Sequence, residues 1–179
     1  NSLSFMLKAT GRFQEAETSF RNALQMDPYN VETIINLGAV LQDQNKLQEA
    51  EQQCRKAIEL KPDFVVAHNN LGSTLNKLGR FNEAEASLKK ALQIKCDCAD
   101  SHFNLGVVYQ AQGRLQDSYA SYENAISNRP DFAKAYSNLS LVLRELGKLA
   151  EAEVILKKAS ALSPDSVEIY GNLSEILKD

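Results

Sequence analysis

Apolar and small residues recur along this chain with a period of 34 residues. Within each period, a first stretch carries them at positions 4, 7, 8 and 11, as in Ile34, Leu37, Gly38 and Leu41. This spacing places the four side chains on one face of a helix. A second helical stretch begins near Phe13, Leu47, Phe81, Leu115 and Leu149. Because no segment alternates apolar and polar residues as a strand does, the pattern predicts an all-α chain with two helices per period.

The period divides the whole chain into repeats that align without a gap. The complete repeats are Val31–Phe64, Val65–Cys98, Ala99–Phe132 and Ala133–Ser166. A partial repeat, Asn1–Asn30, precedes them, and Val167–Asp179 is the first helix of a further one. We therefore expect a single array over residues 1–179, with no linker and no second domain.

Small residues predict where the first helices end and where helices pack closely. Position 15 of the repeat holds Gly11, Asn45, Gly79, Gly113 and Gly147. Glycine, and next asparagine, adopts the left-handed backbone of a helix end at least cost, so we expect that conformation here. Position 8 holds glycine or serine in the middle of the first helix. Since glycine costs about 1 kcal/mol relative to alanine in a helix, its recurrence predicts close contact with a neighbouring helix.

Two further features punctuate the second helices. Glutamate precedes a base by four residues in Glu17–Arg21, Glu51–Arg55, Glu85–Lys89 and Glu153–Lys157, which predicts ion pairs along each helix. Position 32, after the helix, holds Pro28, Pro62, Pro130 and Pro164, with Cys96 in the remaining place. Because proline restricts its predecessor and stops helix propagation, we expect the joint at Cys96 to be the softest of the complete ones.

This set of positions resembles the tetratricopeptide repeat family, whose unit is a helix–turn–helix of 34 residues. The family favours leucine at position 7, glycine or alanine at position 8 and proline at position 32, and these positions hold Leu37, Gly38 and Pro62 here. It also favours an aromatic residue at position 24. Further matches in the same repeat are Leu41, Ala50 and Ala57. The resemblance implies a right-handed α-solenoid superhelix, in which the first helices line a concave groove and the second helices lie outside.

Composition restricts the class of partner and compartment. The chain has 44% hydrophobic and 24% charged residues and a net charge of −3. We expect no nucleic-acid partner, because phosphate contacts need a basic face. We also expect no membrane span, because no run approaches about 18 apolar residues. Three cysteines without a pairing framework favour a reducing compartment, so we expect a cytoplasmic protein, with any targeting signal upstream.

Residues with catalytic or metal-binding chemistry are few. His68 and His102 both occupy position 4, where we expect them to fill an aromatic packing slot. Cys96, Cys98 and His102 have a metal-like composition, but a C-x-C pair with one histidine falls short of the four ligands of structural zinc. The sequence has no phosphate-binding loop and no hydrolase or metalloprotease motif. We expect a non-enzymatic protein without cofactor or metal.

Asparagine occupies position 6 of successive repeats, at Asn36, Asn70, Asn104, Asn138 and Asn172. Asparagine costs up to about 0.7 kcal/mol relative to alanine inside a helix, so five copies call for a reason. Each carboxamide offers a donor and an acceptor, and a row of them can hold an extended peptide by its backbone. The row also resembles the asparagine ladder of the arrays that precede the catalytic domain of O-linked N-acetylglucosamine transferase. Shared ancestry and hydrogen bonds between helices are alternative explanations.

Neighbouring positions of the first helices complete the predicted site. They hold Asn69, Asn76, Lys77, Phe103, Gln110, Lys134 and Arg144. Chaperone-binding relatives clamp a carboxylate with basic residues at positions 5 and 6, and no repeat here has lysine at position 5 or arginine at position 6. We therefore expect no carboxylate clamp. A mixed, mostly uncharged groove favours a polar or mildly apolar internal segment of a protein partner.

These features predict a protein–protein interaction scaffold that binds an extended peptide in its concave groove. One alternative is the substrate-recognition region of a larger multidomain enzyme, such as a glycosyltransferase. Another is a self-assembling structural solenoid. Both terminal repeats are incomplete, and Leu173, Ile176 and Leu177 belong to a final first helix without its second. We therefore expect a fragment of a longer array whose ends can stack on other copies.

Overall fold

The computed structural model describes residues 12–167, 169 and 171–172. The helices of this part are α2 (Phe13–Met26), α3 (Val31–Asp43), α4 (Leu47–Leu60), α5 (Val65–Lys77), α6 (Phe81–Ile94), α7 (Ala99–Ala111), α8 (Leu115–Asn128), α9 (Ala133–Glu145) and α10 (Leu149–Leu162). No strand occurs among the described residues. The predicted all-α class, with two helices per repeat, is confirmed. The five second helices begin at the predicted residues.

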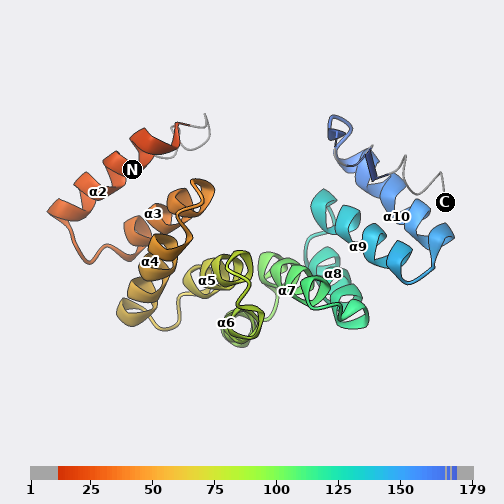
Figure 1. Cartoon of the computed structure of the whole chain (residues 1–179), viewed down its shortest axis with the longest axis horizontal. Helices are drawn as coiled ribbons and strands as arrows, with labels where there is room; N and C mark the ends of the chain where they lie inside the picture. Colours follow the sequence, from red (N-terminus) through yellow and green to blue (C-terminus); the bar gives the residue numbers. More distant parts are fainter. Residues whose placement is uncertain (1–11, 168, 170, 173–179) are drawn as a thin grey trace. The chain divides into compact units, whose positions relative to one another are not determined.

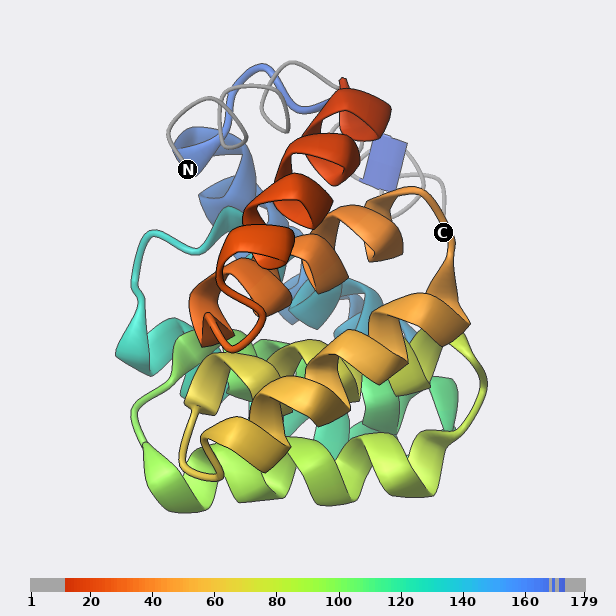
Figure 2. The same cartoon turned by 90° about the vertical axis from the view of Figure 1, so that its left-hand side faces the viewer.

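The helices belong to two compact units, divided between Lys95 and Cys96. In unit 1 (residues 1–95), α3 packs against α4 and α5 against α6, and α5 also contacts α3 and α4 of the preceding repeat (Figure 1). Figure 2 shows the helices of this unit following one another from α2, in red, to α6, in yellow-green. In unit 2 (residues 96–179), α7 packs against α8 and α9 against α10. Each unit is a stack of helix pairs, as in an α-solenoid; the right-handed superhelix and the single array stay predictions.

The first helices end in the predicted left-handed backbone. Asn45 has a φ of 61°, and Gly79, Gly113 and Gly147 have φ between 71° and 76°. Asn45 is the only residue other than glycine with positive φ in the described part of the chain. This conformation turns the chain back so that each second helix packs along the first. Gly11, the remaining member of the predicted set, lies outside the described residues.

Glycine at position 8 allows the closest contacts inside the repeats. A Cβ added to Gly106 would lie 2.7 Å from the ring of Tyr122, and one added to Gly72 would lie 2.5 Å from Leu88 Cγ. Both Tyr122 and Leu88 are fully buried on the second helix. The predicted close approach is therefore confirmed for these two repeats. At Gly38 the nearest atom would be Gln53 Cβ at 3.3 Å, so the contact there is looser.

Each histidine closes the joint that precedes its own helix. His68 Nε2 donates to the carbonyl oxygen of Pro62 at 2.7 Å, and His102 Nε2 donates to that of Cys96 at 2.9 Å. The carbonyl can only accept, so Nε2 carries the proton in both rings. His68 is buried, as expected of a packing residue at position 4, whereas His102 is only half-buried; both imidazoles also satisfy a backbone group at the turn. This second role cannot be predicted from the sequence, because it depends on how the turn folds back.

Candidate functional site

Unit 1 presents two asparagines of the row on one face. Asn36 lies on α3 and Asn70 on α5, at the same position of consecutive repeats, and the two helices are in contact. Both side chains are half-buried, and neither carboxamide makes a hydrogen bond to another described residue. Among the described residues, the donors and the acceptor of both carboxamides are therefore unused.

Some of the polar side chains around Asn36 and Asn70 have hydrogen-bond partners, and others do not. Gln42 Nε2 of α3 donates to Ser73 Oγ of α5 at 3.0 Å and so bridges the two helices. Asn76 Oδ1 is buried and has no hydrogen-bond partner among the described residues. Asn69 is half-buried and interacts with a neighbour, whereas Lys77 is exposed at the end of α5. Helix α5 thus carries four of the predicted site residues, namely Asn69, Asn70, Asn76 and Lys77.

Tyr122 connects the polar side chains of unit 2. It is fully buried on α8, and its hydroxyl accepts a hydrogen bond from Asn138 Nδ2 of α9 at 3.2 Å. The same hydroxyl donates to Gln110 Oε1 of α7 at 3.2 Å. Gln110 Nε2 in turn donates to Glu145 Oε1 of α9, also at 3.2 Å. Four side chains on three helices thus form one chain of hydrogen bonds.

The hydroxyl of Tyr122 stays protonated at neutral pH. Burial raises its pKa to about 12, although the hydrogen bond from Asn138 acts in the opposite direction. It therefore remains a donor to Gln110, and the chain of hydrogen bonds keeps one direction. In the sequence, little distinguishes Tyr122 as a site residue. Its only signal was an aromatic residue at position 24, which the family uses for packing.

Two predicted asparagines have partners inside unit 2. Asn138 binds the hydroxyl of Tyr122, and Asn172 Nδ2 donates to Ser137 Oγ of α9 at 3.0 Å. Asn104, on α7, is half-buried and also interacts with a neighbour. Hydrogen bonding between helices, one of the alternatives considered from the sequence, therefore accounts for part of the row. The remaining predicted residues of α9 are the exposed Lys134 and the half-buried Arg144.

Phe103 belongs to an aromatic cluster. Its ring centroid lies 4.9 Å from that of Phe132 and 5.7 Å from that of Tyr122. The guanidinium of Arg129 lies over Phe132 at 4.6 Å from the centroid and pairs with Asp100 at 2.6 Å. Because these contacts hold the half-buried ring in place, Phe103 packs α7 against its neighbours.

Ion pairs join consecutive second helices in unit 1. Glu17 of α2 pairs with Arg21 at 2.9 Å and with Lys46, the residue before α4, at 2.7 Å. Glu51 of α4 pairs in the same way with Arg80, the residue before α6, at 2.7 Å. Burial acts to raise the pKa of Glu17, but the hydrogen bonds from Lys46 and Arg21 hold it below its ordinary value. Each glutamate thus ties its repeat to the next.

The described residues give no support to a metal centre. They contain no group of three or more histidine, cysteine or acidic side chains placed to hold a metal ion. Cys98 Sγ accepts a hydrogen bond from Ser101 Oγ at 3.2 Å, and His102 is used at its joint. None of the helices in this range combines the length and the hydropathy that a bilayer crossing needs.

Three family models match successive parts of the chain. Models described as tetratricopeptide repeat match residues 7–71 and 96–165, and a model described as TPR repeat matches residues 72–113. A comparison with curated protein sequences finds no match.

Solved structures with the same arrangement of helix pairs include several such repeat proteins. The chain is 28% identical to MamA, with a TM-score of 0.73, and the match covers 90% of this chain and 94% of that one. It is 22% identical to TTC0263, a thermophilic TPR protein of Thermus thermophilus, with a TM-score of 0.89 over 99% and 97% of the two chains. It is 19% identical to YrrB, described as a TPR protein with an unusual peptide-binding site, with a TM-score of 0.66 over 95% and 88%.

Proposed function

Because the chain belongs to the tetratricopeptide repeat family, we propose that it is a non-enzymatic scaffold that binds an extended segment of a partner protein. In unit 1, the segment lies along the first helices α3 and α5, which carry Asn36 and Asn70 of the asparagine row. The peptide-binding site ascribed to YrrB, which has a similar fold, supports a peptide as the class of ligand.

One observation carries this proposal. Asn36 and Asn70 are half-buried on adjacent helices, yet their carboxamides make no hydrogen bond to another described residue. A polar group that is partly removed from water without a partner costs free energy, and a ligand backbone offers such a partner. An extended peptide presents a carbonyl and an amide at every residue, so it matches two carboxamides that each donate and accept.

The first test replaces both asparagines. A library of random 15-residue peptides displayed on phage is selected against the chain, and the enriched peptides are synthesised with a fluorescent label. Asn36→Ala together with Asn70→Ala should weaken their binding at least tenfold, about 1.4 kcal/mol, which is the scale of one to two hydrogen bonds. Fluorescence anisotropy measures the dissociation constant.

The matched control changes two exposed polar residues of the second helices, Gln48→Ala and Asn82→Ala. This control should leave affinity unchanged, and circular dichroism should report the same helicity for both double variants. Equal affinity of the Asn36→Ala, Asn70→Ala protein and the unmodified one would refute the role of the row. This pair is cleaner than one with Asn138, because Asn138→Ala also removes an internal hydrogen bond to Tyr122.

A further inference from the structure

A groove runs between α8 and α10 on the face of unit 2 formed by the second helices. It consists of two neighbouring hollows of about 390 and 220 Å³, which share Glu123, Leu139 and Ile155. Leu139 and Leu143 of α9 are its buried floor. We call this the α8/α10 groove. Its walls run from Tyr119 to Ser127 on α8, a length of about 12 Å at 1.5 Å per residue.

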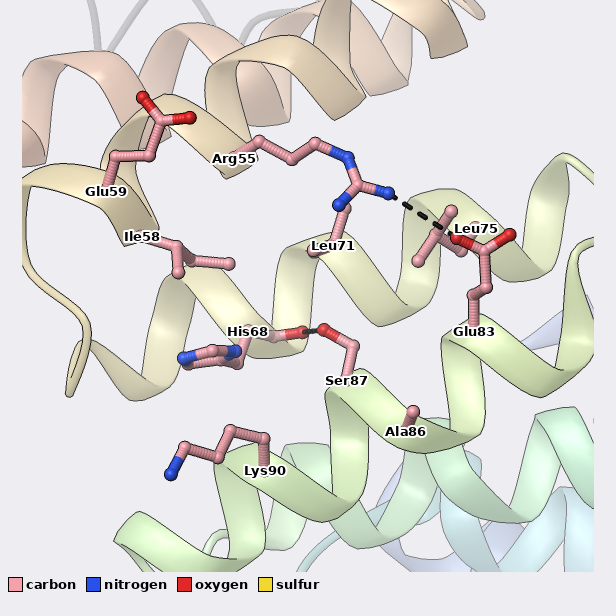
Figure 3. Close-up of a pocket in the computed structure, with 10 residues that line it drawn as sticks. All are labelled: Arg55, Ile58, Glu59, His68, Leu71, Leu75, Glu83, Ala86, Ser87 and Lys90. Atoms are coloured by element: carbon pink, nitrogen blue, oxygen red, sulfur yellow. Dashed lines mark hydrogen bonds and ion pairs between the residues drawn. The ribbon is translucent and has the colours of Figure 1, made fainter.

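Unit 1 has a groove at the same repeat positions, between α4 and α6 (Figure 3). We call it the α4/α6 groove; its volume is about 450 Å³. Arg55 of α4 reaches toward Glu83 of α6, and the two pair at 3.5 Å across the mouth. Arg55 also pairs with Glu51 on its own helix at 2.8 Å. Opposite charges thus neutralise each other over this groove.

The charges over the α8/α10 groove are arranged differently. Glu123 stands at the repeat position of Arg55, and Glu151 at that of Glu83, so two carboxylates replace an ion pair. Tyr119 takes the place of Glu51, and its hydroxyl donates to Glu123 Oε1 at 2.7 Å. Within the described part of the chain, Glu123 has no cationic partner.

Two lysines complete the charges at this groove. Lys148 pairs with Glu151 at 3.4 Å, and its Nζ lies 5.8 Å from the centroid of the Tyr119 ring. Both members of this pair are about half exposed, so the pair is weak and exchanges readily with another cation. Lys158 lines the far end of the groove, beside Ile126 and Tyr136. The hollow that both Glu123 and Glu151 line therefore has two carboxylates near the single cation of Lys148, whereas the other hollow has Glu123 and Lys158.

The walls of the α8/α10 groove are more apolar than those of its counterpart. Val154 and Ile155 of α10 stand where α6 has Ala86 and Ser87. Val154 is 56% exposed. A β-branched residue has no intrinsic advantage at an exposed helix position. Val154 and the half-buried Ile155 thus form an apolar wall beside Glu123, a carboxylate without a cationic partner among the described residues.

We propose that the α8/α10 groove binds a short amphipathic helix of a partner protein, whose apolar side chains contact Val154 and Ile155 and whose lysine or arginine pairs with Glu123 and Glu151. The groove length fits about two helical turns. A helix is favoured over an extended strand because the floor, Leu139 and Leu143, offers no hydrogen-bonding side chain. A helix satisfies its own backbone groups, whereas a strand lying there would leave them unpaired. This is a second surface, independent of the asparagine row.

The test uses a phage library of 14-residue helical peptides with leucine fixed along one face and all other positions randomised. The unmodified chain should enrich peptides with lysine or arginine beside the leucine face. Glu123→Arg gives this groove the charge pair that Arg55 and Glu83 form in unit 1, and this variant should enrich such peptides at least tenfold less. Val154→Asp should weaken the binding of the selected peptides at least tenfold, measured by fluorescence anisotropy.

Matched controls separate this surface from the others. Ala86→Asp, at the position of Val154 in the α4/α6 groove, and Asn36→Ala with Asn70→Ala should each leave the affinity of the selected peptides unchanged. The proposal is overturned if no peptide is enriched, or if the Glu123→Arg variant selects the same basic peptides. It is also overturned if Ala86→Asp weakens binding as much as Val154→Asp does. Loss of binding through the asparagines alone would overturn it as well, because it would place these peptides on the first-helix face.

Discussion

Single atoms decide how closely the helices of a repeat approach each other. A Cβ on Gly106 would meet the Tyr122 ring at 2.7 Å, and that ring is held by hydrogen bonds to Gln110 and Asn138. We expect Gly106→Ala to destabilise the fold by about 1–3 kcal/mol, because the strain of overpacking exceeds the gain in helix propensity. Urea unfolding followed by circular dichroism measures the change.

Gly38→Ala is the control for this prediction, since its nearest neighbour would be Gln53 Cβ at 3.3 Å on a half-buried side chain. Its free energy of unfolding should stay within about 1 kcal/mol of the unmodified chain. Equal destabilisation by the two substitutions would show that the Tyr122 ring is not the cause.

At the scale of single residues, a structure can be predicted from the sequence where a residue type has one physical use. Glycine and asparagine at position 15 serve the left-handed backbone, and Asn45 was correctly identified as their equivalent. The sequence is less informative about side chains that have several physical uses. Phe103 and Asn138 were assigned to a ligand surface, yet both contact Tyr122 within the fold. Which partner such a side chain meets depends on packing between repeats, which the period alone does not specify.

At the scale of elements, the sequence makes a testable prediction about the joints between helix pairs, and in particular about the stability of the joint at Cys96. Lys95, before Cys96, has φ −141° and ψ 98°, and Lys61, before Pro62, has φ −143° and ψ 87°. The backbone at Cys96 is thus already compatible with proline, whose predecessor must be extended. We expect Cys96→Pro to stabilise the fold by about 0.5–1 kcal/mol by restricting the unfolded chain.

Hydrogen exchange locates the effect of this substitution. Amides of Lys95–Cys98 should exchange faster than those of Lys61–Phe64 in the unmodified chain, and Cys96→Pro should reduce the difference. His102→Ala is a useful comparison, because it removes the hydrogen bond to the Cys96 carbonyl and should increase the difference. Protection at Lys95–Cys98 equal to that at Lys61–Phe64 in the unmodified chain would contradict the prediction.

Some ion pairs can be predicted from the sequence of one repeat, and others depend on how consecutive repeats pack. The sequence indicated the pairs along one helix, such as Glu17–Arg21, from their spacing of four residues. It did not indicate that the same glutamates reach the residue before the next second helix, as in Glu51–Arg80. That contact joins residues 29 apart, and it follows only once the helix pairs are stacked. The α8/α10 groove was missed for the same reason.

At the scale of the whole molecule, the buried thiol of Cys54 and the buried hydroxyl of Tyr122 determine how the free energy of unfolding changes at alkaline pH. Burial raises the pKa of the Cys54 thiol, which is 1% exposed, to about 12. The unfolded chain loses this proton near pH 8.5–9, while the folded chain keeps it. The unfolded state then binds fewer protons, so stability falls as pH rises between about 9 and 12. Tyr122 adds to the fall above about pH 10 for the same reason.

We expect the free energy of unfolding to be about 1–2 kcal/mol lower at pH 10 than at pH 8. Urea unfolding at a series of pH values measures it. Cys54→Ala, although less stable at neutral pH, should have a flatter profile between pH 8 and pH 10. A stability of the unmodified chain that is constant through pH 10 would contradict the assigned cause.

The contact between each glutamate and the following repeat has a consequence for how such a chain can grow. Lys46 and Arg80 occupy the same place in consecutive repeats, and either provides the cation that the preceding glutamate needs. A gene duplication that copied Val31–Phe64 in tandem would therefore bring Glu51 of one copy opposite a lysine of the next, and no ion pair would be lost. Duplicating Ala99–Phe132 would instead place Asp117 and Ala120 of the next copy where Glu151 and Val154 stand, so the new groove would keep its acidic side chains but lose its apolar wall. In evolutionary terms, copying Val31–Phe64 extends the array with its ion pairs intact, whereas copying a single repeat does not reproduce the α8/α10 groove, because its walls come from two different repeats.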